Sequence, residues 1–231
     1  MRLVDTVKGI ISEWHHLGYQ VLYHGKDLQG KLTLPFDPYR ETVLLTHGYG
    51  ARGRSLEYIA RKLHNDGFNA VPLYYHFWDD LEEVSLELVN NIREYHGRQD
   101  KDRQLHLIAH SMGGLVTCDA SRIVPDLIAS ATFLGTPFGG TSKARFGIGK
   151  SAEQLQPQSE YLRRLLSDGL PEEIEYAVVQ GTRDKVITLE KSRLRLDQPN
   201  ITHYQIETGH LGLTGLKGYS IVKQVVGKKG I

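Results

Sequence analysis

The 231-residue chain is poor in cysteine and has no long uninterrupted apolar run. Its single cysteine, Cys118, excludes an intramolecular disulfide framework and a cysteine-rich zinc module. No stretch reaches the roughly eighteen consecutive apolar residues that a membrane-spanning helix needs, so we expect no insertion into a membrane. After Met1 and Arg2, the charged residues Asp5, Lys8 and Glu13 interrupt any apolar segment in the N-terminal region. They disfavour a secretory signal and make a cytoplasmic location the expectation.

The charge balance also lacks a dominant sign. Lysine and arginine number 28, aspartate and glutamate number 27, and the formal net charge is +1. Nucleic-acid-binding domains carry a marked positive excess, so no nucleic-acid partner is expected. Neither a Gly-x-Gly-x-x-Gly segment nor a Walker-type phosphate loop occurs, which argues against nucleotide chemistry. The 11 histidines show no metal-like grouping, so the sequence predicts neither a metal site nor a cofactor.

What the chain does contain is the composition and pattern of an α/β protein. Apolar residues make up 40% and charged residues 24%, as is typical of globular domains. From residue 42 onward, short apolar runs alternate with helical patterns, which indicates a parallel sheet covered by helices on both faces. The length suits a single domain over residues 1–231. We expect strands near 42–46, 68–75, 105–109, 131–134, 176–180 and 201–206, and helices near 56–67, 81–92, 112–123 and 216–227.

The first residues carry a separate amphipathic pattern, which predicts an extra N-terminal helix at about 1–18. Its polar face is not basic, and this favours packing on the domain over the alternative of binding a membrane surface or a partner. The apolar stripe consists of Leu3, Val4, Val7, Ile10, Ile11, Trp14 and Leu17.

The segment Ala109-His110-Ser111-Met112-Gly113 follows an expected strand and opens an expected helix. This is the context of a nucleophile elbow, where a sharp turn exposes a serine and small neighbours let the strand and helix approach each other. Ala109 stands where glycine is common and is small enough for the role. The alternative is that Ser111 only caps the helix.

Together with Gly135-Thr136-Pro137 and Gly139-Gly140-Thr141, this segment resembles the α/β-hydrolase superfamily, and within it the small bacterial lipases and esterases. The Ala-x-Ser-x-Gly form is similar to that of Bacillus-type lipases. The Gly-Thr-Pro segment is similar to class-2 lipases and GPI inositol-deacylase-like hydrolases. The resemblance covers about residues 42–227. It implies an α/β-hydrolase fold with a mostly parallel central sheet, a serine nucleophile at Ser111 and no cofactor.

The resemblance also implies a catalytic triad in the chain order Ser111, Asp184, His210. Asp184 lies in a Gly-x-x-Asp turn after the fifth expected strand, and His210 lies in a Gly-His loop after the sixth. Asp197 is the reserve candidate for the acid, because Asp184 could instead be a plain turn former. His203 lies within the sixth strand and is expected to be structural.

The implied oxyanion hole uses the backbone N–H groups of Tyr49 and Met112. Tyr49 follows His47 and Gly48 at the end of the first expected strand, and Met112 follows the nucleophile. Two fixed N–H groups about 3 Å from the developing negative oxygen stabilise the transition state of acyl transfer. The alternative for the first segment is a tight turn made by its glycines.

Candidate substrate-binding residues lie first in an aromatic cluster after the second expected strand. Tyr75, Phe77 and Trp78 either line an apolar pocket there or pack beneath the insertion that comes later in the chain.

That insertion, residues 138–170, is expected to form a small cap that partly roofs the nucleophile. A flexible glycine-rich stretch containing Phe138, Phe146 and Ile148 leads into one helix over 153–166. The alternative is a rigid segment that only shapes the rim of the site.

Taken together, these features predict a serine carboxylesterase or lipase that hydrolyses short- to medium-chain esters through an acyl-enzyme. The expected partner is a small-molecule ester substrate. A thioesterase, amidase or acyltransferase with the same triad is the alternative. A binding module without catalysis is a third possibility, disfavoured because no triad residue is missing.

Overall fold

The computed structural model describes residues 32–51, 53–100, 102–167 and 169–227. Within them, six strands form one sheet in the order β2-β1-β3-β4-β5-β6, and every neighbouring pair is parallel. The expected α/β class with a parallel sheet is therefore confirmed, whereas the helix predicted at about 1–18 lies outside the described residues. The strands are β1 (Thr42–Thr46), β2 (Asn69–Pro72), β3 (Leu105–His110), β4 (Ile128–Leu134), β5 (Glu175–Gly181) and β6 (Ile201–Ile206).

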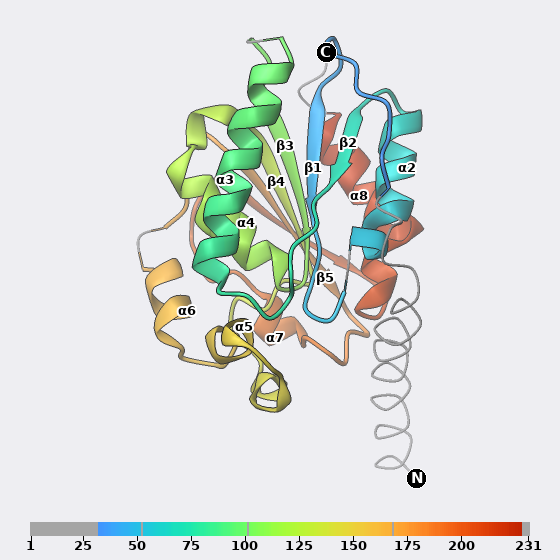
Figure 1. The fold of residues 1–231 in the computed structure, drawn as a ribbon. Coiled ribbons are helices and arrows are strands. Elements are labelled where there is room, and N and C mark those ends of the chain that lie inside the picture. The colour runs from blue at the N-terminus through green and yellow to red at the C-terminus, as the bar shows by residue number, and fades with distance from the viewer. Residues whose placement is uncertain (1–31, 52, 101, 168, 228–231) are drawn as a thin grey trace.

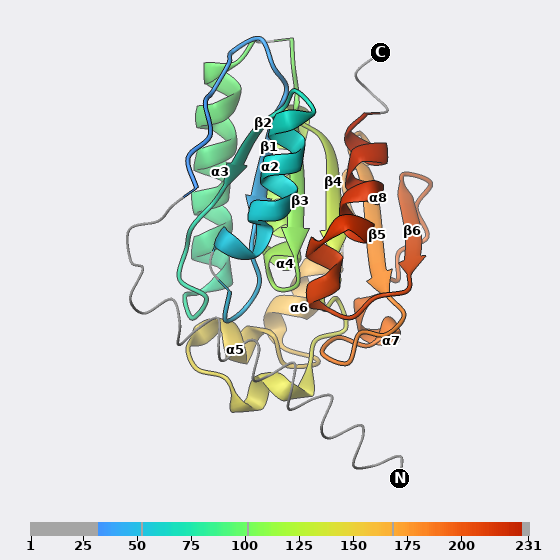
Figure 2. The ribbon, with the colours of Figure 1, turned by 90° about the vertical axis from the view of Figure 1, so that its right-hand side faces the viewer.

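Helices cover both faces of this sheet (Figures 1 and 2). Helices α3 (Leu81–Arg98) and α4 (Gly113–Ile123) pack on one face, and α2 (Glu57–Asn65) and α8 (Leu216–Val226) pack on the other. Because successive side chains of a strand point to opposite faces, β1 places Leu44 in one core and both Val43 and Leu45 in the other. Two apolar cores result, and they hold the sheet between two helical layers.

Local sequence explains where several elements begin and end. Asp80 caps α3, because its carboxylate accepts a hydrogen bond from the Glu82 N–H at 2.9 Å. Beyond α2, Gly67 has a φ of 97°, which glycine adopts readily and other residues do not. Strand β2 ends at Pro72 and is shorter than the predicted 68–75. Pro72 is tolerated because β2 is an edge strand and the N–H groups on either side, those of Asn69 and Leu73, are the ones that donate toward β1. The Leu73 N–H still donates to the Leu45 carbonyl at 2.8 Å, and beyond it the Tyr75 hydroxyl donates to the His47 carbonyl in the loop after β1.

The cap predicted over residues 138–170 lies beyond the carboxyl ends of the strands (Figure 2). Its described part contains three short helices: η4 (Ser142–Phe146), α5 (Lys150–Gln154) and α6 (Glu160–Leu165). One short further helix, α7 (Leu189–Ser192), follows β5.

The single helix predicted over 153–166 is wrong. Pro157 prevents the chain from continuing as a helix, and Gln158 has a φ of 64°, outside the helical region. Helix α6 then starts afresh, since the Ser159 hydroxyl accepts a hydrogen bond from the Leu162 N–H at 3.2 Å. The prediction failed because leucines at helical spacing outweighed the proline between them. All three of those leucines, Leu155, Leu162 and Leu165, are nevertheless buried.

None of the helices in the described residues has both the length and the apolar character needed to cross a membrane.

Candidate active site

Ser111 occupies the sharp turn between β3 and α4. Its φ is 55°, a left-handed conformation that is rare for a residue with a side chain. The Ser111 N–H donates to the carbonyl of Leu134 at 2.9 Å, which ties the turn to the end of β4. Such strained backbone persists only where the surroundings enforce it, and it is concentrated at functional sites. This left-handed strand-to-helix turn has the backbone that a nucleophile elbow requires, whereas an ordinary helix N-cap is extended.

Close packing of glycines makes the elbow possible. A Cβ at Gly113 would lie 2.5 Å from the His47 carbonyl oxygen, and one at Gly114 would lie 1.8 Å from the Thr136 hydroxyl. Neither position can hold a side chain without moving its neighbours, so helix α4 approaches the ends of β1 and β4 through bare backbone. Gly48 lies equally close, because its Cβ would be 2.7 Å from that of Ser111. The loop after β1 is therefore pressed against Ser111.

Asp184 and His210 meet at the same edge of the sheet. Asp184 follows β5 and His210 follows β6, and the distance from His210 Nδ1 to Asp184 Oδ2 is 2.7 Å. Both side chains are buried. A carboxylate only accepts hydrogen bonds, so His210 Nδ1 donates to Asp184 Oδ2 and carries a proton.

The second carboxylate oxygen of Asp184 is held by backbone. Oδ1 accepts hydrogen bonds from the N–H groups of Val186 and Ile187, each at 2.8 Å. Gly135, at a φ of 62°, lies beside the pair, because its Cβ would be 3.3 Å from His210 Nδ1. Buried polar groups are costly unless they are hydrogen-bonded, and these bonds satisfy the carboxylate on both oxygens. The acid is thereby fixed in position relative to the histidine.

The reserve acid lies elsewhere. Asp197 is exposed on the loop between α7 and β6, and it lines a different surface hollow from the one that contains Ser111. His203 is exposed on the edge strand β6. The tertiary structure thus brings Asp184, and not Asp197, to His210.

The loop after β1, residues 47–50, is the predicted oxyanion loop. Its His47 ring is buried and stacks on Tyr75, with ring centroids 4.1 Å apart and an interplanar angle of 8°. Burial lowers the pKa of His47 to about 4, so the ring is neutral at pH 7. The Tyr75 hydroxyl donates to the His47 carbonyl, and the Ala51 N–H donates to the Gly48 carbonyl at 3.2 Å. These contacts fix the backbone that leads to Tyr49.

His110 is a residue whose part in the site the sequence did not predict. Its Nε2 lies 3.1 Å from the His210 carbonyl oxygen, and it must donate there because a carbonyl only accepts. The two rings lie 4.6 Å apart, and burial keeps the pKa of His110 well below its usual value. A neutral His110 therefore supports the backbone of His210 without placing a second positive charge beside it.

Ser111 and His210 open onto one cavity of about 290 Å³. Of the six predicted substrate-binding residues, Phe77, Phe146 and Ile148 line it. Residues that the sequence did not single out complete the lining, and most are apolar: Ala51, Pro137, Ala144, Leu155, Val186, Ile187 and Leu211. They come from four separated loops, so no local pattern could have grouped them.

The other three predicted substrate-binding residues lie outside this lining. Tyr75 turns to the His47 backbone, and Phe138 is buried against Phe133, with ring centroids 5.3 Å apart. Trp78 stacks on His76, with ring centroids 4.8 Å apart, and lies against Gly149. Apolar character in the right segment was therefore insufficient, because side-chain direction decides which aromatic rings reach the cavity.

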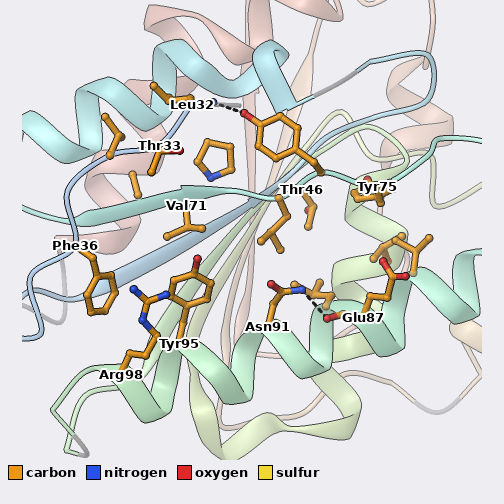
Figure 3. Close-up of a pocket in the computed structure, with 18 residues that line it drawn as sticks. Leu32, Thr33, Phe36, Thr46, Val71, Tyr75, Glu87, Asn91, Tyr95 and Arg98 are labelled. Atoms are coloured by element: carbon orange, nitrogen blue, oxygen red, sulfur yellow. Dashed lines mark hydrogen bonds between the residues drawn. The ribbon is translucent and has the colours of Figure 1, made fainter. Parts of the chain in front are cut away.

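A second cavity, of about 410 Å³, lies at the β2 edge of the sheet (Figure 3). Helix α3 contributes Glu87, Asn91, Tyr95 and Arg98 to its wall, and Tyr75 lies at one end (Figure 3). It is the larger of the two cavities, but it contains none of Ser111, Asp184 and His210. We therefore regard the smaller cavity as the candidate active site.

Within the described residues, no three histidine, cysteine, aspartate or glutamate side chains gather as metal ligands would. Cys118 is buried on α4, and burial raises its pKa to about 12, so it stays a thiol.

No protein-family model matches the chain, and no curated protein matches it in sequence. Solved structures do match. The mature form of the Bacillus licheniformis lipase BlEst2 superposes with a TM-score of 0.66 at 16% identity, covering 85% of this chain and 96% of that one. For the Paleococcus ferrophilus monoacylglycerol lipase the TM-score is 0.63 at 16% identity, with 85% and 99% covered. For a pyrethroid hydrolase from Sphingobium faniae JZ-2 it is 0.59 at 14%, with 83% and 99% covered. The chain has the α/β-hydrolase fold that the sequence predicted.

Proposed function

We propose that the protein is a serine hydrolase of carboxylic esters. One observation carries this proposal: Asp184 is hydrogen-bonded to His210, and His210 and the strained Ser111 open onto a common, mostly apolar cavity at the same edge of the sheet. A serine, a histidine and a carboxylate in this order and arrangement are the components of nucleophilic acyl transfer. The solved structures of the same fold include proteins named as lipases and a pyrethroid hydrolase, which supports the same class of reaction.

In the proposed reaction, the Ser111 hydroxyl attacks the ester carbonyl while His210 Nε2 accepts its proton. Asp184 keeps the proton of His210 on Nδ1 and stabilises the imidazolium that forms. The backbone N–H groups of Tyr49 and Met112 are proposed to hold the negative oxygen of the tetrahedral intermediate. His210 then returns the proton to the leaving alcohol, and water releases the acid from the acyl-enzyme. The chemistry requires only these groups.

The cavity supports small or medium acyl groups as substrates. Ligand cavities run from about 300 to 1,000 Å³, and the 290 Å³ here is at the lower end of that range. The lining is mostly apolar, which suits a hydrocarbon chain better than a charged or sugar group. Residues 138–170 are proposed to act as a small cap over this space, with Phe146 and Ile148 at its mouth.

The proposal is tested by labelling and by a substrate panel. A fluorophosphonate probe should label the purified protein at Ser111, and p-nitrophenyl esters from acetate to palmitate should be hydrolysed best at short and medium lengths. The same enzyme is then given acyl-CoA and aryl amides at matched concentrations. Faster turnover of acyl-CoA or amides than of esters would mean that the protein is a thioesterase or an amidase rather than an esterase. Absence of labelling would indicate that the protein is a non-catalytic binding module with a hydrolase fold.

A further inference from the structure

The cap crosses the candidate active site between two loops that carry its other parts. We define the cap loop as residues 141–149. At one end of it, the Lys143 ammonium donates to the carbonyls of Lys185 and Val186, which follow the acid Asp184. At the other end, the backbone of Ile148 is bound by the side chain of Tyr49 from the oxyanion loop. The cap loop is thus attached on both sides of the cavity that it covers.

The attachment at Tyr49 is two-fold. The Tyr49 hydroxyl donates to the carbonyl of Ile148 at 2.9 Å and accepts from the N–H of the same residue at 2.6 Å. One side-chain oxygen therefore satisfies both polar groups of one peptide residue. The Tyr49 ring also packs edge-on against Phe77, with centroids 4.8 Å apart, so the hydroxyl is held by a ring that has its own support in the cavity wall.

Glycine at position 147 is what lets the hydroxyl come so close. A Cβ on Gly147 would lie 2.8 Å from the Tyr49 oxygen, which is closer than Cβ atoms approach other atoms in proteins. The tight contact therefore depends on the absence of a side chain there, next to the residue that is bound.

Side-chain packing does little to hold the same stretch. Phe146 is 78% exposed and Ile148 is 64% exposed, although both line the cavity. Exposed apolar side chains contribute little free energy through burial. Backbone hydrogen bonds therefore contribute more to holding this stretch in position. The bonds from Tyr49 are the ones made to Ile148 itself.

From this geometry we propose that Tyr49 is a specificity-determining residue: its hydroxyl fixes the cap loop over the cavity and so limits the length of acyl group that fits. The inference rests on the proposed ester hydrolysis. It assigns the Tyr49 side chain a role separate from that of its backbone N–H. Release of the hydroxyl lets Phe146 and Ile148 move outward, and longer chains then enter.

The test uses Tyr49→Phe, which removes both hydrogen bonds and keeps the ring that packs on Phe77. The ratio of kcat/KM for p-nitrophenyl laurate to that for the butyrate should rise about tenfold, the order expected for two hydrogen bonds. The matched control is Tyr75→Phe, which removes a hydroxyl bound to the same oxyanion loop but not to the cap. It should change the two substrates by the same factor. An equal shift of the ratio in both variants would overturn the proposal, as would an unchanged ratio in Tyr49→Phe.

A second measurement does not depend on catalysis. Amide hydrogen exchange in a peptide covering residues 146–150 should be faster in Tyr49→Phe than in the wild type, and unchanged in Tyr75→Phe. Unchanged exchange in Tyr49→Phe would show that the hydroxyl does not hold the cap loop. If exchange rises while no fluorophosphonate labels the wild type, the attachment stands and the proposed ester hydrolysis fails.

Discussion

The buried edge that carries Ser111, Asp184 and His210 differs sharply from the cap loop that lies over it. At the edge, the polar atoms of the acid are bound to backbone or to the histidine, and glycines let main chains approach within van der Waals distance. In the cap loop, two large apolar side chains are exposed and a few hydrogen bonds attach the loop to its surroundings.

This difference suits the two tasks of the proposed active site, bond-making chemistry and substrate selection. Bond-making chemistry needs groups fixed to a fraction of an ångström, and a dense network of hydrogen bonds and close backbone contacts provides that. Substrate selection needs only an apolar surface of suitable size, which a loosely attached loop provides and which can vary without disturbing the chemistry. Mutations at the edge should therefore abolish activity, and mutations in the cap loop should redistribute it among substrates.

The largest effect is expected from Ser111→Ala. Loss of the nucleophile should lower kcat for p-nitrophenyl butyrate by about 10⁴-fold or more. The melting temperature should stay nearly unchanged, since only one oxygen is removed at the end of the cavity. Retention of wild-type activity would show that Ser111 is a structural turn and not the nucleophile.

The acid comes next. Asp184→Asn should lower kcat by about 10⁴-fold, because an amide favours the wrong tautomer of His210. Asp197→Asn is the matched control, as it makes the same change at an exposed carboxylate outside the cavity. It should alter kcat by less than about twofold, as is usual for a surface substitution. The opposite pattern would mean that the acid of the triad has been assigned to the wrong turn.

Low pH should destabilise the sheet edge, where the buried His47 lies, before it affects the cap loop, which contains no histidine. The pKa of His47 is about 4 in the folded protein, below its unfolded value, so the unfolded chain binds the proton more readily. Stability from this group is complete above about pH 6.5 and falls as the pH drops toward 4, by about 3 kcal/mol over that window.

The measurement is the free energy of unfolding between pH 8 and 4.5 for the wild type and for His47→Gln. The variant is expected to be less stable at pH 8 and to show a shallower loss on acidification. If both proteins have the same slope, His47 does not titrate on unfolding and the depressed pKa is not a property of the folded loop.

The smallest effect on catalysis is expected in the cap loop. The double variant Phe146→Ala, Ile148→Ala should keep kcat for short esters within about threefold and change the acyl-length profile, because these side chains line the cavity mouth. Leu86→Ala is the control, since Leu86 is 55% exposed on α3 and outside the cavity lining. An unchanged profile in the double variant would remove this loop from the substrate site. A strong preference of the wild type for emulsified long-chain triglyceride would contradict the small-cap interpretation.

The sequence by itself determined the parallel sheet and the sharp turn at Ser111. Apolar runs predicted β1 and β3 almost to the residue, because a strand buried on both faces has few polar positions to blur its ends. The bounds of β6 were also predicted, although it is an edge strand whose side chains are partly exposed. Ser111 was predicted as the nucleophile because an elbow needs small residues at fixed offsets from the serine, a constraint that is local in the chain. The acid and base were predicted from turns after strands, and parallel strands place such turns at one edge.

The tertiary structure alone decided which side chains share the cavity. Tyr75, Trp78 and Phe138 have apolar rings and lie in the predicted segments, but they contact the His47 backbone, His76 and Phe133 instead of lining the cavity at Ser111. The contact between Tyr49 and Ile148 joins residues 99 positions apart, and the contact between His110 and His210 joins residues 100 positions apart. Sequence patterns reflect only the conformational preferences of residues that are close together in the chain. Such distant pairs depend instead on how the loops pack once the sheet has formed.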